Sequence, residues 1–526
     1  MAKVFEADII IIGGGIGGCS AALAAAKSGK KVIVTEETKW IGGQLTSQAV
    51  PPDEHRWIEQ FGCTQTYRQF RDRVRAYYKR EYPLTSDARR EQRLNPGNAW
   101  VSRIAHEPRV ALNVIETMLA PYMSNGTITI LKQHKMIDAE VEKDHILSVT
   151  VRDMVQKQRK ILVGSYFLDA TEIGDVLPHA GVEYVTGAES QEQTGEPNAH
   201  SGEAKPLDMQ SITHCMAVDY VEGGDFTIEK PEQYDFWKDY QASFLDHKQL
   251  SWYGPDASTG ESRPFSMFPG DSSAPSLWDY RRLIDPTNFE ADFFEGGISI
   301  LNWPQNDYWL GPVYEVDEEE RERHLYGAKQ LTLSLLYWLQ TEAPREKGGY
   351  GYPGLRPRGD IVGTDDGLAL HPYIRESRRI KAEHTVLEQH INADVRGDKG
   401  IKHVPDSVGV GSYWIDLHPT VETNRLFFAP SYPFEIPLGS MIPIRVENLI
   451  PAAKNIGVTH LTNGCFRLHP VEWNIGEAAG YLAAYALEHG RTPREIYHDE
   501  ETLSTFQSFI VSEGIEIKWP EIGILE

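Results

Sequence analysis

The sequence is poor in cysteine and in long apolar runs. Its 526 residues include only four cysteines, Cys19, Cys63, Cys215 and Cys465, and no two of them form a Cys-x-x-Cys pair. This spacing argues against a zinc ribbon, an iron–sulfur cluster or a dithiol redox centre, and so few cysteines fit a reducing compartment. The apolar run at residues 9–12 is far too short to span a bilayer.

Positive charge is also scarce. Lysine and arginine number 52 against 76 acidic residues, which gives a formal net charge of -24. Nucleic acids and anionic membrane surfaces repel such a chain unless basic residues gather locally. The one basic stretch, residues 68–93, is interpreted as a solvated helix face. We therefore expect no nucleic-acid or membrane partner, and the short, non-basic start before the first strand predicts a cytoplasmic location.

Several catalytic signatures are missing. The sequence has no H-x-x-x-H or H-E-x-x-H pair, no carboxylate spacing typical of a calcium loop and no G-x-S-x-G elbow, so we expect no metal site and no serine hydrolase. Apolar residues make up 40% and charged residues 24% of the chain, which is ordinary for a globular protein. The length favours two or more lobes.

The start of the chain has the pattern of a dinucleotide site. Residues 8–12 are an acid followed by four isoleucines, then comes G-x-G-x-x-G from Gly13 to Gly18, an alanine-rich helix over 19–28 and a strand over 31–35 that ends at Glu36. Gly13 permits the tight turn, Gly15 lets the backbone approach a pyrophosphate and Gly18 lets helix pack on strand. The helix N-terminus binds phosphate, and Glu36 can accept hydrogen bonds from ribose hydroxyls.

A second glycine pair separates FAD from NAD as the expected ligand. Gly42 and Gly43 follow Glu36 closely, and Gln44 and Leu45 come next. Glycines here would let the chain pass close to a diphosphate and a flavin, whereas a plain NAD dehydrogenase has no need of them. We expect no second nucleotide site of this kind for a nicotinamide cofactor.

With these motifs the chain resembles FAD-dependent oxidoreductases of the glutathione-reductase structural class, in the branch of the fumarate-reductase and succinate-dehydrogenase flavoproteins. Three segments carry the resemblance: residues 8–46, 127–175 and 436–487. The middle one shows short strands at 127–131, 136–142, 146–152, 160–163 and 165–168, which resemble the β-meander of the family. A segment similar to its A-T-G motif follows, with Glu172 in place of the usual glycine.

The resemblance also implies which residues bind the cofactor. Met136 falls where the family packs against the adenine, and Arg467, Leu468 and His469 fall near the isoalloxazine, at the start of a helix that directs its N-terminus at the flavin pyrimidine. The full set of expected FAD-binding residues is Gly13, Gly15, Ile16, Gly17, Gly18, Glu36, Glu37, Gly42, Gly43, Gln44, Leu45, Met136, Ala170, Thr171, Gly174, Asp175, Arg467, Leu468 and His469. We assume non-covalent FAD.

The predicted fold is α/β, with a Rossmann-type FAD-binding domain, built from a parallel sheet and a β-meander, and an inserted α+β substrate lobe. Residues 1–190 and 436–490 form the FAD-binding domain, 191–357 the capping lobe, 358–435 the return to the FAD domain and 491–526 a C-terminal extension. The capping lobe is rich in tryptophan and contains one clear amphipathic helix over 318–340. Its aromatics could line a ligand site, a core or a homo-oligomer interface.

Catalytic candidates come from histidine and arginine. A neutral histidine is a natural base near neutral pH, and His418 and His460 lie close in sequence to the flavin-like segments, although a core histidine bonded to backbone is the alternative for each. Arg375 and Arg378 could bind a substrate carboxylate, or could only fix the two lobes through ion pairs.

These features predict an FAD-dependent oxidoreductase, a dehydrogenase or oxidase. It would take a hydride from a C–H next to OH or NH of a small polar, sugar-like substrate, and pass electrons to an unidentified acceptor. The alternatives are a reductase of an activated double bond, a flavin monooxygenase and a non-redox protein with structural FAD.

Overall fold

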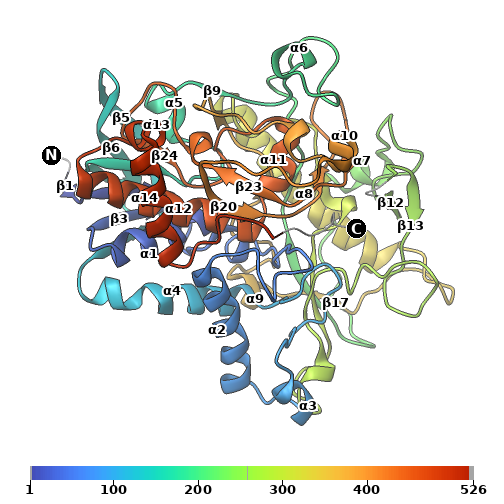
Figure 1. Cartoon of the computed structure of the whole chain (residues 1–526). Coiled ribbons are helices and arrows are strands. Elements are labelled where there is room, and N and C mark those ends of the chain that lie inside the picture. Colours follow the sequence, from blue (N-terminus) through green and yellow to red (C-terminus); the bar gives the residue numbers. More distant parts are fainter. Residues whose placement is uncertain (1–2, 257–258, 521–526) are drawn as a thin grey trace.

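A five-stranded parallel sheet lies in the left part of the computed structural model as drawn in Figure 1, and the structure describes residues 3–256 and 259–520. Its strands, in spatial order, are β24 (Leu449–Pro451), β8 (Tyr166–Asp169), β2 (Ile9–Ile12), β3 (Val32–Glu36) and β4 (Ile128–Lys132). All four isoleucines of β2 are buried, because helices or other strands cover both faces of the sheet, as continuous apolar runs predict. The expected α/β class is confirmed.

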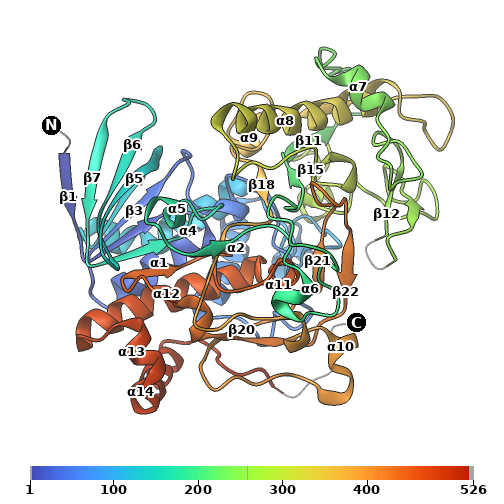
Figure 2. The same cartoon turned by 90° about the horizontal axis from the view of Figure 1, so that it is seen from above.

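A second sheet forms the meander that the sequence predicts. Its order is β1 (Lys3–Glu6), β7 (Arg159–Val163), β6 (His145–Asp153) and β5 (His134–Glu142). Strands β5, β6 and β7 pair antiparallel, whereas β1 pairs parallel with β7. Figure 2 shows this sheet at the left, beside β3 of the parallel sheet. The first strand of the predicted meander, at 127–131, belongs instead to the parallel sheet as β4.

Helices α1 (Ile16–Lys27) and α12 (His469–His489) pack together along one face of the parallel sheet. A Cβ atom added to Gly476 would lie 2.1 Å from the Gly17 carbonyl oxygen, and one added to Gly480 would lie 2.3 Å from that of Ala21. The two helices therefore touch backbone to backbone, which larger side chains would prevent. Helix α4 (Pro108–Ser124) also contacts α1.

The tryptophan-rich part of the chain builds a second apolar core. Its sheet consists of β14 (Arg282–Ile284), β15 (Ile298–Leu301), β11 (Met216–Tyr220) and β17 (Leu355–Pro357), in that order. Side chains alternate between the two faces of a strand, and along β11 Met216 and Val218 join the second core while Ala217 joins the main core. Helix α8 (Glu318–Thr341), predicted over 318–340, covers the second core. The proposed domain boundaries stay predictions.

Short strand pairs and helices connect these two cores. The strands are β10 (Ile212–Thr213) with β16 (Asp307–Tyr308) and β18 (Tyr373–Ile374), β12 (Tyr253–Pro255) with β13 (Ser262–Pro264), β9 (Tyr184–Val185) with β19 (Arg379–Ile380), β20 (Ser407–Gly411) with β23 (Phe434–Pro437), and β21 (Ile415–Leu417) with β22 (Phe427–Ala429). The remaining helices are α2 (Gln65–Glu81), α3 (Ser86–Arg90), α5 (Val176–His179), α6 (Gln191–Thr194), α7 (Tyr234–Asp239), α9 (Gly359–Val362), α10 (Ala393–Arg396), α11 (His460–Phe466), α13 (Pro493–His498) and α14 (Glu500–Ser512).

The basic stretch on α2 corrects one expectation. Arg71 is only 1% exposed, and its guanidinium group donates hydrogen bonds to Glu54 and Glu59. Arg75 also donates to Glu59 and is buried. The interpretation as a solvated face is wrong for these two residues, because carboxylates of the preceding loop fold back onto the helix. Among the described helices, none has the length and apolar character needed to cross a membrane.

Candidate functional site

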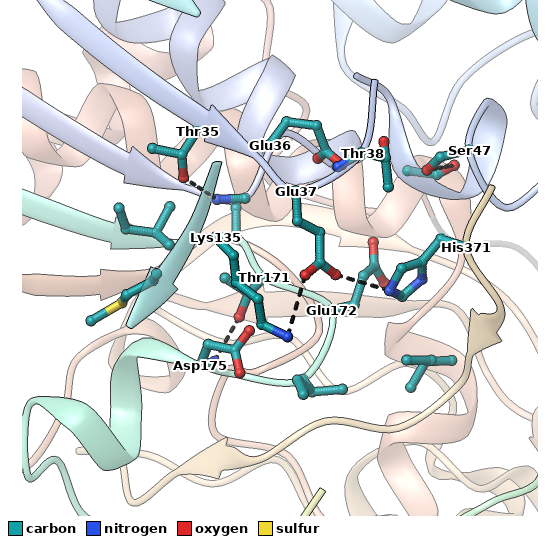
Figure 3. Close-up of a pocket in the computed structure, with 18 of the residues that line it drawn as sticks. Thr35, Glu36, Glu37, Thr38, Ser47, Lys135, Thr171, Glu172, Asp175 and His371 are labelled. Atoms are coloured by element: carbon teal, nitrogen blue, oxygen red, sulfur yellow. Dashed lines mark hydrogen bonds and ion pairs between the residues drawn. The ribbon is translucent and has the colours of Figure 1, made fainter. Parts of the chain in front are cut away.

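A cavity lies beside the N-terminus of α1 and the carboxyl ends of β2, β3 and β8; we call it the N-terminal cavity (Figure 3). The carboxyl edge of parallel strands is where open α/β sheets bind ligands. The cavity is lined by Ile12, Gly13, Gly15, Thr35, Glu36, Glu37, Thr38, Gly43, Ser47, Gln48, His134, Lys135, Met136, Ala170, Thr171, Glu172, Ile173, Asp175, Arg321, His371 and Ile374.

Glycines bring two turns of backbone together in this cavity. Gly13 has a φ of +97°, and a Cβ atom added there would lie 2.2 Å from the Ala170 carbonyl oxygen. A Cβ added to Gly43 would lie 2.9 Å from the Gly15 Cα atom. Within the described chain no side chain caps the N-terminus of α1, and its first turn has no acidic residue. Free N–H groups beside a glycine cradle fit a diphosphate.

Glu36 ends β3 with its carboxylate held in place. The carboxylate accepts hydrogen bonds from the Gly14 N–H at 3.1 Å and the Thr38 N–H at 2.8 Å. Burial raises the pKa of Glu36 to about 7. Met136, on β5, is also buried and lines the same cavity. A fixed carboxylate with an apolar side chain in the same cavity fits an adenosine, whose ribose donates hydroxyl groups and whose base is flat.

An ion pair in this cavity joins residues that are far apart in the chain. The Glu37 carboxylate lies 3.0 Å from Nε2 of His371 and 3.6 Å from Nζ of Lys135 (Figure 3). Burial would raise the pKa of Glu37, but the hydrogen bond and charge of His371 lower it well below its usual range. Arg321 of α8, from the tryptophan-rich part of the chain, lines the same cavity.

The structure brings together about half of the expected FAD-binding residues in this cavity. Those that line it are Gly13, Gly15, Glu36, Glu37, Gly43, Met136, Ala170, Thr171 and Asp175. Those placed outside it are Ile16, Gly17, Gly18, Gly42, Gln44, Leu45, Gly174, Arg467, Leu468 and His469. Gly17 and Gly18 serve packing, since a Cβ added to either would lie within about 2 Å of the Ala452 or Gly13 carbonyl oxygen.

The sequence analysis missed several lining residues. Ser47 and Gln48 follow the second glycine pair, and Lys135 is the neighbour of Met136, so proximity to named motifs could have indicated all three. Arg321 and His371 have no such signal, because they reach the cavity only through the packing of the second core against the sheet.

A buried charged cluster lies deeper, at the N-terminus of α12. Nζ of Lys454 lies 2.5 Å from Oε2 of Glu172, and Lys454 is fully buried. Nε2 of Gln44 donates to Oε2 of Glu472 at 2.7 Å, and burial raises the pKa of Glu472 to about 7. Oε1 of Gln44 and both amide atoms of Gln48 have no hydrogen-bond partner among the described residues. Buried, unsatisfied polar atoms indicate a polar group that binds here, which fits the edge of a flavin.

His469 and Arg467 lie at the same helix end. His469 accepts a hydrogen bond at Nδ1 from the Asp53 N–H (3.1 Å) and donates from Nε2 to the Val50 carbonyl (3.2 Å). These partners fix the neutral tautomer with the proton on Nε2, and burial lowers the pKa of His469 to about 4. The Arg467 carbonyl accepts from Gln44 at 3.1 Å. Arg467 is thus tied to the glycine-rich turn that contains Gln44.

A second cavity lies between the tryptophan-rich part of the chain and residues 413–428; we call it the aromatic cavity. Its walls come from the β12–β13 hairpin, the segment around β16 and the β21–β22 pair. It is lined by Leu245, His247, Gln249, Tyr253, Gly254, Pro255, Arg263, Phe265, Leu277, Tyr280, Pro304, Gln305, Asp307, Trp309, Tyr413, Asp416, Leu417, His418, Pro419, Leu426 and Phe428.

His418 is the histidine of this cavity with a carboxylate near each ring nitrogen. Nδ1 lies 2.6 Å from Oδ2 of Asp307, and Nε2 lies 3.6 Å from Oδ2 of Asp416. The first distance is a hydrogen bond and the second is longer than one. The Nδ1–H of the ring therefore points at Asp307, whereas Nε2 keeps its lone pair or proton for another partner.

Arginines and hydrogen bonds keep both carboxylates of this cavity ionised. Burial alone would raise the pKa of Asp307, but Arg375, His418 and Thr213 hold it at about 2. Burial likewise opposes ionisation of Asp416, while His418 and Arg467 keep its pKa well below the usual range. Both acids act as fixed negative charges at neutral pH.

The other predicted catalytic residues lie outside both cavities. Arg375 is 2% exposed and donates to Asp307, Thr213 and the Ser211 carbonyl. Arg378 pairs with Glu315 at 2.6 Å. Nδ1 of His460 lies 2.9 Å from the Glu376 carboxylate, which also contacts Arg379. For these three the geometry is that of buried ion networks; their catalytic roles stay untested.

Arg467 connects the two parts of the site. One of its guanidinium nitrogens donates to the Asp416 carbonyl at 3.1 Å, and the other donates to the Tyr373 hydroxyl group. Its own carbonyl bonds to Gln44, as described above. A single residue therefore joins the wall of the aromatic cavity to the turn beside the N-terminus of α12.

Comparison with known proteins adds a family. About a third of the chain is 26% identical, over 179 residues, to soluble pyridine nucleotide transhydrogenases of Mycobacterium bovis (strain BCG / Pasteur 1173P2) and Mycobacterium tuberculosis (strain ATCC 25177 / H37Ra), and this match spans 33% of those relatives. Among solved structures, the chain is similar to the flavin-dependent monooxygenase PieE in complex with FAD and substrate, with 11% identity over 73% of this chain and 52% of that one, at a TM-score of 0.28. It is also similar to L-proline dehydrogenase from P. horikoshii, with 13% identity over 36% of this chain and 24% of that one, at a TM-score of 0.19.

Residues 8–509, nearly the whole chain, match the family described as FAD dependent oxidoreductase. The chain belongs to this family, and its cofactor is FAD.

Proposed function

We propose that this oxidoreductase removes a hydride from a C–H bond next to an OH or NH group of a small polar substrate held in the aromatic cavity. FAD, when bound, supplies the hydride acceptor. The observation that carries the proposal is the pairing of His418 with Asp307 in the wall of a cavity that Arg467 links to the flavin end of the FAD site.

His418 is the base of this proposal. When hydride leaves carbon, the adjacent O–H or N–H must lose its proton, and Nε2 of His418 is the nitrogen that Asp307 leaves available. Asp307 orients the ring through Nδ1, as a carboxylate does in nucleophile–base–acid triads. Arg375 and Thr213 in turn hold Asp307, with hydrogen bonds of 3.0 and 2.5 Å. We therefore assign Arg375 to positioning and not to substrate binding.

The residues around the N-terminal cavity would hold FAD non-covalently. Gly13, Gly15 and the first turn of α1 suit the diphosphate, and Glu36 suits the ribose. Gln44, Gln48 and the uncapped N-terminus of α12 suit the flavin edge, because they offer unpaired polar groups there. The positive end of the α12 dipole would favour negative charge at that edge.

The test is an anaerobic spectrum of the purified holoenzyme mixed with sugars, cyclitols, amines and hydroxy acids. Bleaching of the flavin band by one class supports oxidation of that class, and later addition of oxygen separates oxidase from dehydrogenase. Because the curated relatives are named pyridine nucleotide transhydrogenases, NADH and NADPH belong in the same panel. Bleaching by a reduced nicotinamide alone would contradict the proposal.

Substitution separates the two candidate bases. We expect His418→Gln to slow flavin reduction by about 10²–10⁴-fold, the usual contribution of a general base. His403 is a matched control, since its Nδ1 lies 2.7 Å from Glu435 but it lies outside the aromatic cavity. His403→Gln should keep the wild-type rate. A normal rate in His418→Gln with a slow rate in His460→Gln would move the base to His460.

A further inference from the structure

The wall of the aromatic cavity presents every second residue of one segment to the ligand space. Gln305, Asp307 and Trp309 all line the cavity, whereas Asn306 and Tyr308 belong to the protein interior. Gln305 lies in the 3-10 turn Pro304–Asn306, and Asp307 begins β16 directly after it. Asp307, with its partner His418, therefore has a polar or aromatic neighbour from the same segment on each side in the cavity wall.

Gln305 presents a fixed acceptor. Its Nε2 donates to the carbonyl oxygens of Ser251 and Tyr253 at 3.3 and 3.1 Å. Both partners only accept, so the amide nitrogen must face them and the orientation of the amide group is settled. Oε1 is then left buried without a hydrogen-bond partner among the described residues. A donor from a ligand would satisfy it.

Trp309 presents a fixed donor. The side chain is buried, at 4% exposure, and its ring stands edge-on to Phe244 with the ring centres 5.6 Å apart. An indole N–H can only donate, and Nε1 of Trp309 is buried with no acceptor in the described part of the chain. Leaving such a group unpaired costs stability, so an acceptor from a ligand is expected there.

The charges of the cavity are already compensated within the protein. Asp307 is shared by Arg375, Thr213 and His418, and Asp416 is paired with Arg467. Arg263, the arginine of the cavity wall, pairs with Asp256 at 2.9 Å. No charged side chain that lines the cavity therefore stands ready, within the described structure, to neutralise an ionic substrate, and burying an unpaired charge there would be costly.

We propose that the substrate is a neutral polyhydroxylated compound of the size of a monosaccharide or cyclitol. One of its hydroxyl groups loses a proton to His418, while others bond to Oε1 of Gln305 and Nε1 of Trp309. A hydroxyl both donates and accepts, so one type of group satisfies both positions; an ammonium group only donates and a carboxylate only accepts. The aromatic rings of Tyr280 and Tyr413 in the wall suit the apolar faces of such a ring. The substrate class rests on the proposed function, since it places the reacting hydroxyl at His418.

The test uses the holoenzyme with glucose, galactose and myo-inositol as probes, and with benzylamine and lactate as representatives of amines and hydroxy acids. Anaerobic flavin reduction gives rate and KM, and titration calorimetry gives binding independently of turnover. We expect the polyols to reduce the flavin, and Trp309→Phe to raise KM and Kd for them about three- to tenfold with little change in the maximal rate, the effect of losing one neutral hydrogen bond.

Trp237→Phe is the matched control. Trp237 is equally buried and its indole nitrogen also lacks a partner among the described residues, but it lies in the second core outside the cavity. We expect Trp237→Phe to leave both KM and Kd for the polyols unchanged.

The outcomes separate the two proposals. Flavin reduction by benzylamine or lactate and not by polyols overturns the substrate class and leaves the proposed function standing. Polyol binding that Trp309→Phe weakens, without flavin reduction by any probe, supports the substrate class and overturns the proposed function. Unchanged constants in Trp309→Phe, or no binding of any polyol, overturn the substrate class.

Discussion

The two cavities are built from different parts of the polypeptide. Backbone makes the N-terminal cavity, through Gly13, Gly15 and Gly43 and the open end of α1. Side chains make the aromatic cavity, with six aromatic rings and a histidine between two carboxylates. A cavity formed by backbone suits the diphosphate, which every dinucleotide contains. A cavity lined by side chains can change by substitution to suit one ligand without loss of the fold.

Their carboxylates differ in the same way. In the N-terminal cavity burial raises the pKa of Glu36 to about 7 and also raises that of Asp175. In the aromatic cavity arginine and histidine hold Asp307 at about 2 and keep Asp416 low. Glu37 is the exception in the first cavity, because His371 pairs with it. Burial therefore dominates the pKa of Glu36 and Asp175 in the N-terminal cavity, whereas charged neighbours dominate the pKa of Asp307 and Asp416 in the aromatic cavity.

The strongest test of the aromatic cavity is the Asp307→Asn variant. The change removes the carboxylate that orients His418, so we expect flavin reduction by substrate to slow by about 10²–10⁴-fold, equivalent to about 3–5 kcal/mol, and its pH profile to shift. FAD content should stay at the wild-type level. Asp219→Asn is the control, because Asp219 is a buried acid paired with two arginines outside both cavities. An unchanged rate in Asp307→Asn would remove Asp307 from the mechanism.

The Gly13→Ala variant tests the role of the backbone in the N-terminal cavity. The added methyl group would meet backbone at 2.2 Å in a residue with φ of +97°. We expect a loss of about 3 kcal/mol or more in the free energy of unfolding, together with loss of bound FAD. Gly29→Ala shares the positive φ, +76°, but has open space around it, so it should cost only about 1 kcal/mol and keep FAD. Measured flavin-to-protein ratios decide; equal ratios in both variants would contradict the backbone account.

A pH series tests the difference in electrostatics. The pKa of Glu36 in the folded chain is about 7 against an ordinary 4.5, so its contribution to stability is complete below the ordinary value and is lost as the pH rises through about 7. For the FAD-free chain we expect the free energy of unfolding to fall by about 1–3 kcal/mol between about pH 5 and pH 8. In Glu36→Gln this part of the fall should disappear.

The Glu37→Gln variant tests a carboxylate whose pKa is shifted in the opposite direction from that of Glu36. The lowered pKa of Glu37 means that its contribution is present above the ordinary value and is lost only in acid. Glu37 also raises the pKa of His371, so the stability advantage of wild type over this variant should shrink as the pH rises and His371 loses its proton. Parallel pH curves for wild type and Glu36→Gln would show that the buried carboxylate is not the cause.

The smallest effect is expected at the boundary between the two regions. Arg321, on α8, lines the N-terminal cavity, and its Nε is buried with no partner among the described residues. We expect Arg321→Ala to weaken FAD binding about three- to tenfold, the scale of one hydrogen bond. Arg323→Ala, two residues along the same helix and exposed, should leave the Kd unchanged. Equal affinities would show that the second core does not contribute to FAD binding.

The predicted residues that do meet in the N-terminal cavity are mostly contiguous in the chain. Gly13, Gly15 and Glu36 belong to one strand–turn–helix–strand unit, and their roles follow from local geometry. The same local reasoning placed Gly17 at the cofactor, and the structure shows that its missing side chain makes room for the backbone of Ala452, which follows β24. A motif indicates which residues are glycine, but not which neighbour each one accommodates.

The aromatic cavity was beyond such reasoning. His418 was named as a candidate base, but its partner Asp307 lies more than a hundred residues earlier, and only the short pairing of β10, β16 and β18 brings β16 beside the rest of the site. Arg375 was named for substrate and lies behind Asp307. Likewise Arg71 and Arg75 looked solvated until Glu54 and Glu59 folded onto them. Each of these interactions joins residues that lie apart in the chain, and no periodic pattern in the sequence predicts it.

The parallel sheet has a consequence for the order of biosynthesis. Strand β2 and helix α1 are synthesised well before β24 and α12, which complete their packing and span residues 449–489. At 5–20 residues per second, the chain between them takes on the order of a minute to synthesise, and during that time the four isoleucines of β2 lack the strand and helix that complete their burial. The nascent chain therefore needs shielding from aggregation until β24 and α12 have been made. A truncated protein that ends before β24 would retain the complete nucleotide fingerprint and bind no cofactor.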